Sequence, residues 1–91
     1  MRLEFQPSFD RRFKKLPLER QRNARAAIDS LLAYLDHRMP LRPGLGLKNF
    51  QGDYWEIRLD IHARIIFELT DRVIFWLVGN HDEVRRFMRG K

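Results

Sequence analysis

The 91-residue sequence contains no cysteine and no long apolar run. Without cysteine, a disulfide framework, a thiolate metal site and a thiol nucleophile are all excluded. No apolar stretch approaches the roughly 20 residues that a membrane-spanning helix needs. The amino terminus is charged from Arg2 onwards and lacks the apolar region of a signal peptide. We therefore expect a cytoplasmic protein that has no membrane partner.

Several catalytic signatures are missing as well. There is no glycine-rich phosphate loop before a helix and no HExxH motif. The three histidines, His37, His62 and His81, have no spacing that suggests a shared metal site, so we expect neither a metal nor a cofactor. Only Ser8 and Ser30 could be serine nucleophiles, and both have simpler roles, as a helix cap and as a helix-surface residue.

Length and charge set further limits. A chain of 91 residues with 44% apolar content is expected to form one small domain over residues 1–91, which buries about two thirds of its unfolded surface at best. Eighteen Lys and Arg against twelve Asp and Glu leave a net charge of +6, spread along the whole chain. Such an excess favours a polyanionic partner, nucleic acid first and an acidic protein second.

Alternation of apolar and polar residues dominates the chain between residues 53 and 81. Apart from Asp71, every odd-numbered residue from Trp55 to Leu77 is apolar. This period of two is typical of strands that bury one face, and here it predicts that the odd face is buried. Turn signals at 60–63 and 70–72 divide the stretch into three strands, which suits an antiparallel meander.

The remaining segments predict helices on both sides of this meander. Ala24, Ile28 and Leu31 belong to the apolar stripe of the longest helical pattern, which should cover the odd face of the sheet. The class is therefore α+β: an N-terminal helical hairpin packed on an antiparallel sheet, with a short N-terminal strand and a C-terminal helix. The expected elements are an edge strand over 2–6, a helix from Phe9 to Pro17 capped by Ser8, a helix from Leu18 to about Leu35, a strand near 48–50, and a terminal helix capped by Asn80 or Asp82.

The even-numbered face of the meander is the candidate functional surface. An even register sum in the first hairpin places Arg58 opposite or diagonal to Arg64, where like charges are destabilising. Either solvent and a nearby Glu56 or Glu68 screen the pair, or an anion sits between the two arginines. We expect Glu68 to balance Arg64 and take no part in chemistry. Trp76 on the same face is either part of a small second apolar patch or a stacking platform.

Charged groups of these types suit the cleavage of RNA without a metal. A base takes the proton of the 2′-hydroxyl, cations stabilise the charge that builds up on phosphorus, and an acid protonates the leaving oxygen. His81 either simply ends the last strand or, near a helix start that favours its neutral form, acts as a base. The residues that carry this hypothesis are Glu56, Arg58, Arg64 and His81, with Lys48 and Arg85 nearby.

The order of elements and four stretches of sequence resemble the RelE/ParE superfamily of toxins from type II toxin-antitoxin pairs. The stretches are LKNF at 47–50 followed by Gly52, YWEIRL at 54–59, ARIIFEL at 63–69 and VGNHDEV at 78–84. The order of the elements matches that of the family along the whole chain, and about half of the amino-acid sequence is recognisably similar. It implies a RelE-like fold, translation inhibition by cleavage of mRNA in the ribosomal A site, a 2′,3′-cyclic phosphate product and a cognate acidic antitoxin.

Site residues are carried over by position. Arg64 matches the phosphate-stabilising arginine, and Arg58 matches the basic residue before the first hairpin turn. Glu56 stands where some members have a carboxylate general base, and His81 stands where members carry a histidine or arginine near the scissile phosphate. Lys48, Arg85 and Arg86 are the expected RNA-binding residues.

The chain departs from the family at Arg85, where many ribonuclease members have tyrosine; an arginine there can still stack on a base or bind phosphate. This departure keeps two alternatives open. One is a ParE-like toxin that acts on DNA gyrase and not on RNA. The other is a non-catalytic module that only binds its acidic antitoxin.

Overall fold

The computed structural model describes residues 1–91 as three helices and five strands. None of the three helices is both long and apolar enough to cross a membrane. In chain order the elements are β1 (Arg2–Phe5), α1 (Pro7–Lys15), α2 (Leu18–His37), β2 (Gly46–Gln51), β3 (Tyr54–Arg58), β4 (Arg64–Leu69), β5 (Arg72–Gly79) and α3 (His81–Arg89).

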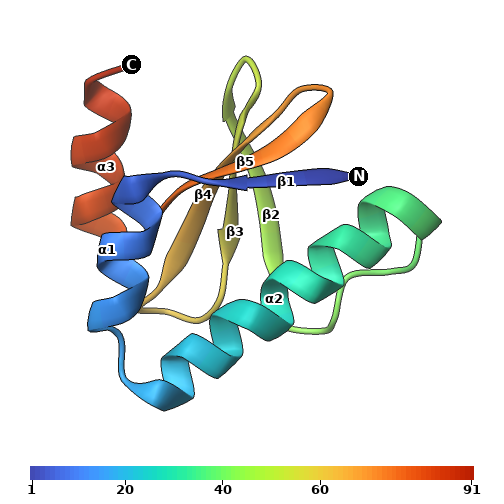
Figure 1. The fold of residues 1–91 in the computed structure, drawn as a ribbon, viewed down its shortest axis with the longest axis horizontal. Helices are drawn as coiled ribbons and strands as arrows, with labels where there is room; N and C mark the ends of the chain where they lie inside the picture. Colours follow the sequence, from blue (N-terminus) through green and yellow to red (C-terminus); the bar gives the residue numbers. More distant parts are fainter.

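The strands form one sheet in the order β1-β5-β4-β3-β2. Strands β2 to β5 are successive antiparallel neighbours, so the predicted meander is confirmed, and its turns fall where the sequence placed them. Strand β1 lies at the edge, as expected, but it pairs parallel to β5 (Figure 1). The sheet is therefore mixed, whereas the sequence analysis expected an antiparallel one, and the α+β class is correct.

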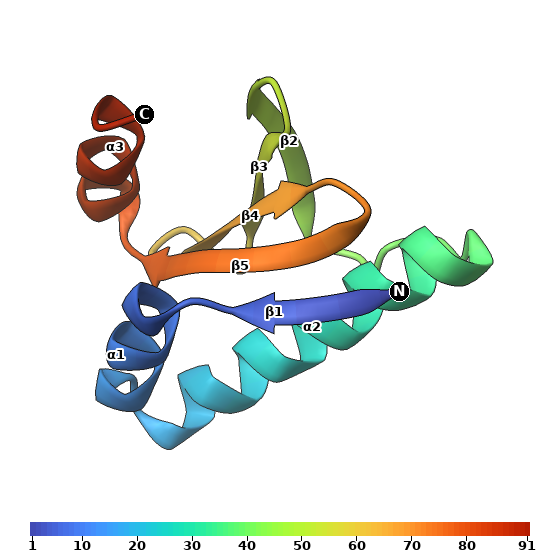
Figure 2. The same ribbon diagram turned by 45° about the horizontal axis from the view of Figure 1, so that its top comes forward.

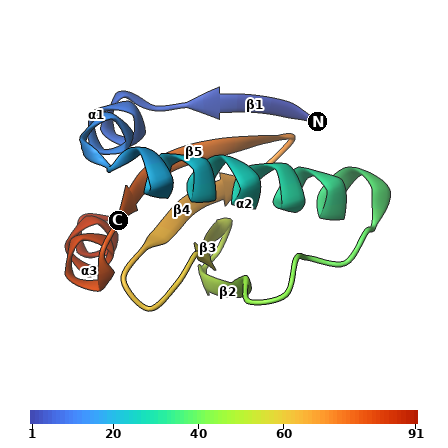
Figure 3. The same cartoon turned by 90° about the horizontal axis from the view of Figure 1, so that it is seen from below.

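Helices α1 and α2 lie on one side of β5, and α3 lies on the other (Figure 2). Seen from below, α2 runs across the sheet (Figure 3), and its predicted apolar stripe is buried there at Ala24, Ile28 and Leu31. The helical hairpin therefore covers one face, as expected. The main core is formed by Phe9, Ala24, Ile28, Leu31, Ile57, Ile65, Phe67, Val73, Phe75 and Val78.

A bulge in β5 overturns the expectation that every odd-numbered residue up to Leu77 shares one face. Ile66 pairs with Leu77 and the next residue of β4 pairs with Phe75, which leaves Trp76 without a partner. An extra residue in one strand reverses the alternation beyond it. Leu77 therefore lies under α3 in a second small cluster with Ile66 and Val84, and Val78 takes its place in the main core.

Some expected helix ends were also wrong. Helix α1 begins at Pro7, where a proline costs no hydrogen bond, and its N-cap is Gln6 without a side-chain bond. Ser8 does not cap it, because its hydroxyl donates to the carbonyl of Trp76 at 2.5 Å. The terminal helix is capped by Asn80, one of the two predicted candidates.

Candidate active site

One row of the sheet holds two arginines between two glycines. Arg58 on β3 pairs directly with Arg64 on β4. On the outer sides, Gly46 of β2 pairs with Arg58, and Gly79 of β5 pairs with Arg64. We call these four residues the arginine row. Because glycine has no side chain, the two ends of the row add no side chain of their own beside the arginines.

Glu56 holds one side of the Arg64 guanidinium. Its carboxylate oxygen lies 3.3 Å from Nε of Arg64, and the two side chains are only 9% and 12% exposed. Nη1 of Arg64 is buried and has no hydrogen-bond partner. An unused buried donor costs free energy. The protein thus fixes the orientation of Arg64 and leaves part of its donor capacity free.

This ion pair corrects the expected partner of Arg64. Glu68, which the sequence analysis assigned to that role, instead accepts a hydrogen bond from the indole of Trp76 at 3.0 Å. Glu68 lies opposite Tyr54, two residue pairs further along the hairpin than Glu56. The charge on Arg64 is therefore balanced from β3 and not from its own strand.

Lys48 joins the same surface from β2. It pairs with Glu56, two residue pairs along the sheet from the arginine row. Lys48 is exposed, and its ammonium lies over the ring of Phe50 at 5.2 Å from the centroid. Three neighbouring strands therefore bring Lys48, Glu56, Arg58 and Arg64 together, as the sequence predicted.

His81 lies beside this surface and not over it. It is the first residue of α3 and follows Gly79 of the arginine row by two positions. Its side chain is exposed and lines an open cleft of about 640 Å³, together with Arg12 and Lys15 of α1. The cleft meets the arginine row at Gly79, but Glu56, Arg58 and Arg64 do not line it. His81 is therefore adjacent to the predicted set without contacting it.

Arg85 and Arg86 are exposed on α3, which turns its buried Val84 towards the sheet. Neither arginine forms an ion pair. The start of the helix is fixed by a capping box, in which Asn80 and Glu83 exchange hydrogen bonds at 2.9 Å. The two arginines are thus presented to solvent on a helix of defined position.

Asp60 stabilises the turn that sets the register of the arginines. Its carboxylate accepts hydrogen bonds from the backbone N–H groups of His62 at 2.6 Å and Ala63 at 2.9 Å. Burial by itself raises the pKa of Asp60, but these two bonds, with the charges of Arg20 and His62, outweigh it and lower the pKa below its ordinary value. The turn between β3 and β4 is therefore held by a charged carboxylate.

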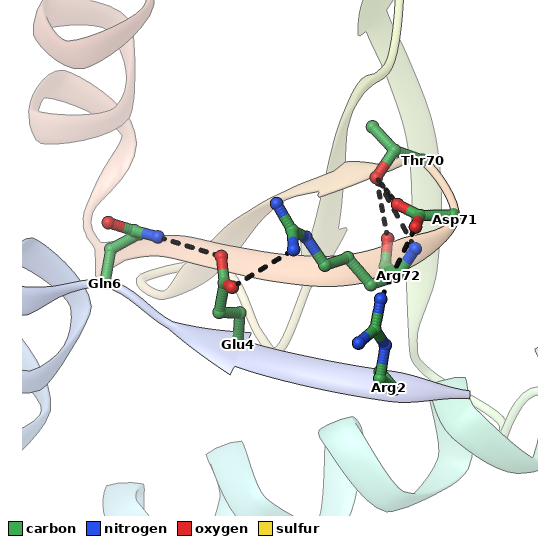
Figure 4. A network of polar contacts seen from close by, with 6 residues as sticks. All are labelled: Arg2, Glu4, Gln6, Thr70, Asp71 and Arg72. Atoms are coloured by element: carbon green, nitrogen blue, oxygen red, sulfur yellow. Dashed lines mark hydrogen bonds and ion pairs between the residues drawn. The ribbon is translucent and has the colours of Figure 1, made fainter.

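A second arginine with an unused buried donor provides a contrast. Nε of Arg72 has no partner, yet the guanidinium of Arg72 lies 3.5 Å from Glu4. This pair belongs to a polar network that ties β1 to the start of β5 and to the turn before it, with Arg2 beside Asp71 (Figure 4). Arg72 lies at the opposite end of β5 from Gly79, so it serves the sheet edge and not the arginine row.

The sequence analysis missed the glycines of the row. Neither Gly46 nor Gly79 is among the predicted site residues. A side chain at Gly79 would place its Cβ 2.9 Å from a carboxylate oxygen of Glu83. Only the pairing of these glycines with Arg58 and Arg64 marks them as part of the row, and that pairing is known only from the register of the strands.

No protein-family model matches this sequence, and no curated protein matches it. Solved structures do match the fold. A chain of the RelB-RelE antitoxin-toxin complex from Methanococcus jannaschii is 21% identical, with a TM-score of 0.68 over 92% of this chain and 96% of that chain. A chain of the DinJ-YafQ complex from E. coli is 19% identical, with a TM-score of 0.68 over 92% and 98%.

The chain has the RelE/YafQ toxin fold. A metal-bound toxin from Helicobacter pylori also has this RelE-like fold, with 17% identity and a TM-score of 0.68 over 92% of this chain and 98% of that one. In the present RelE-like chain, no group of three or more His, Cys, Asp or Glu side chains is arranged to hold a metal ion. The fold expectation is confirmed, including the helical hairpin on one face of the sheet.

Proposed function

We propose that this RelE-like chain is the toxin of a toxin-antitoxin pair and an endoribonuclease that cleaves mRNA at the ribosome without a metal. The observation that supports this most strongly is the arginine row. Two arginines lie directly opposite each other on neighbouring strands, with a buried carboxylate paired to one of them and a glycine at each end of the row. Surface chemistry of this kind suits a bound phosphate.

The pairing of Arg58 with Arg64 is costly without an anion. Like charges directly opposite on neighbouring strands are destabilising, and Glu56 contacts only Arg64. A phosphodiester placed between the two would accept hydrogen bonds from both guanidinium groups, whose planar fork matches phosphate oxygens. The row is therefore better suited to binding an anion than to stabilising the free protein.

The proposed reaction assigns a role to each of these residues. A base removes the proton of the 2′-hydroxyl, the 2′-oxygen bonds to phosphorus, and the bond from phosphorus to the 5′-oxygen breaks as an acid donates a proton to that oxygen. Arg58 and Arg64 stabilise the negative charge on the phosphorus oxygens. Glu56 and His81 are the candidates for the two proton transfers. The products are a 2′,3′-cyclic phosphate and a 5′-hydroxyl.

The exposed cations around the row would hold the RNA on either side of the cleavage point. Lys48 extends the surface across β2, and Arg85 and Arg86 extend it along α3. Arg85 can stack its guanidinium plane on a base, which substitutes for the tyrosine that many relatives carry. The RelB-RelE and DinJ-YafQ complexes and the net charge of +6 support an acidic antitoxin as the partner of this chain.

The test replaces Arg64 with lysine, which keeps the positive charge but loses the planar guanidinium group and its paired N–H donors. With mRNA on translating ribosomes, Arg64→Lys should cleave about 10²- to 10³-fold more slowly than the parent protein, the usual loss when one transition-state donor is removed. Arg72→Lys is the matched control, because Arg72 also has an unused buried donor but lies at the far end of β5. It should cleave at the parental rate, and mass spectrometry should find the cyclic phosphate.

Three outcomes would count against the proposal. One is cleavage by Arg64→Lys as fast as that by Arg72→Lys, which would remove the arginine row from the reaction. Another is expression that causes DNA breaks while translation continues, which would favour a ParE-like action on gyrase. Growth that is unaffected by strong expression would favour a module that only binds the antitoxin.

A further inference from the structure

Three aromatic rings surround one ammonium group at the far end of α3. Nζ of Lys91 lies 4.2 Å from the ring centroid of Trp76, 4.8 Å from that of Phe87 and 5.7 Å from that of Tyr54. The rings come from β5, α3 and β3, so segments distant in sequence meet around a single cation. All three distances are within the range in which a cation is attracted to an aromatic face. We call the three rings the aromatic cage.

The walls of the cage are fixed by the fold. Trp76 is the bulged residue of β5, and its indole N–H donates to Glu68 at 3.0 Å. Phe87 packs against Trp76 with ring centroids 5.9 Å apart and planes inclined by 41°. The rings therefore have defined orientations, and the bulge and the hydrogen bond to Glu68 account for that of Trp76.

Two carboxylates lie near the cage. The pKa of Tyr54 is raised, first by burial and then by the charges of Glu68 and Asp53. Both carboxylates therefore act on the cage, and the phenol stays neutral at physiological pH. Anionic groups next to π faces favour a cation and repel a phosphate, so this end of the sheet differs in chemistry from the arginine row.

We propose that Tyr54, Trp76 and Phe87 form an aromatic cage for alkylammonium groups, with Glu68 as its counter-charge and Lys91 as the cation that occupies it in this structure. The lysine ties the end of α3 to β3 and β5. A free alkylammonium ion of similar size competes with Lys91 for the same rings. The cage does not depend on RNA cleavage, because none of its residues belongs to the arginine row.

The experiment titrates tetramethylammonium chloride into the protein and follows the fluorescence of Trp76. Trp55→Phe removes the only other tryptophan and serves as the background, and sodium chloride at equal concentration is the salt control. Lys91→Ala empties the cage. We expect a saturable change in Lys91→Ala at about tenfold lower tetramethylammonium than in the protein with Lys91, because a tethered competitor acts at high effective concentration.

Two further variants test the cage itself in the Lys91→Ala protein. Phe87→Leu keeps the apolar bulk but removes one π face, and Glu68→Gln removes the counter-charge. Each should weaken binding by about threefold. If circular dichroism shows that Phe87→Leu is unfolded, the binding measured with Glu68→Gln alone tests the cage. A response no larger than that to sodium chloride, equal half-saturation with and without Lys91, or no weakening by Glu68→Gln would each overturn the proposal.

Discussion

At the scale of single residues, Asp60 and Glu56 do most to place the candidate catalytic groups. Asp60 fixes the turn through two backbone N–H groups, and that turn puts Arg58 opposite Arg64. Glu56 then orients one of the two guanidinium groups. Asp60 acts on the turn and Glu56 acts on one guanidinium group, so each effect can be tested by a single substitution.

Asp60→Ala should lower the free energy of unfolding at pH 7 by about 1 to 2 kcal/mol, since two hydrogen bonds to a charged acceptor are lost. The pKa of Asp60 is lowered in the folded protein. Its contribution is therefore fully present above the unfolded value of about 3.9 and is lost as the pH falls through the folded value. Urea unfolding at several pH values should show the two proteins converging below about pH 4.

Asp29→Ala is the control for this prediction, because Asp29 is an exposed carboxylate on α2. It should change stability by less than about 0.5 kcal/mol. A stability gap between Asp60→Ala and the parent that persists unchanged into acid would show that the charge of Asp60 is not what holds the turn.

At the scale of elements, the junction between β5 and α3 is the most constrained part of the molecule. The bulge at Trp76 moves Leu77 under α3, and the capping box then starts the helix within three residues of Leu77. Glu83 of this box also forms an ion pair with Arg12 of α1. A disturbance at Gly79 should therefore affect the position of α3 and, through it, His81.

Gly79→Ala should destabilise the protein by about 1 to 2 kcal/mol, because the new methyl group would meet Glu83 and disturb the capping box. Gly46→Ala is a matched control at the other end of the arginine row. Its Cβ would lie 3.7 Å from Cβ of Arg58, an ordinary contact. Urea unfolding should therefore find Gly46→Ala within about 0.5 kcal/mol of the parent. Equal losses in the two variants would contradict this account.

At the scale of the whole molecule, two helices cover one face of the sheet, and the other face carries both proposed sites. Helices α1 and α2 cover the first face over the main core. On the second face, Val84 of α3 packs against Ile66 and Leu77, and the three rings of the aromatic cage pack around this cluster. The second face thus carries the arginine row on β3 and β4 and the aromatic cage between β3, β5 and α3.

The net charge of +6 predicts that association with an acidic antitoxin depends on salt. The proposed antitoxin, expected as a small acidic protein encoded next to this chain, should bind at least about tenfold more weakly in about 0.5 M than in about 0.05 M sodium chloride, because screening removes long-range attraction. Isothermal titration calorimetry measures the change. An affinity that is independent of salt, or a neighbouring gene product that does not bind, would argue against a charge-driven partner.

The amino-acid sequence by itself determined the strands, the turns and the opposition of Arg58 and Arg64. These follow from local rules: a period of two marks the buried face, and turn residues 60–63 set an even register. The same rules predicted that Lys48 and Glu56 would share the surface with the two arginines. They also predicted the apolar stripe of α2 and the cap at Asn80.

Only the tertiary structure decided the features that depend on contacts between distant segments. The parallel pairing of β1, the bulge at Trp76 and the choice of Glu56 over Glu68 as the partner of Arg64 are all of this kind. Periodicity cannot show where an extra residue enters a strand. It also cannot show which of two carboxylates on one face, Glu56 or Glu68, forms the ion pair with Arg64, because that choice depends on the packing around them. The packing of α3 likewise decided that His81 lies beside the arginine row.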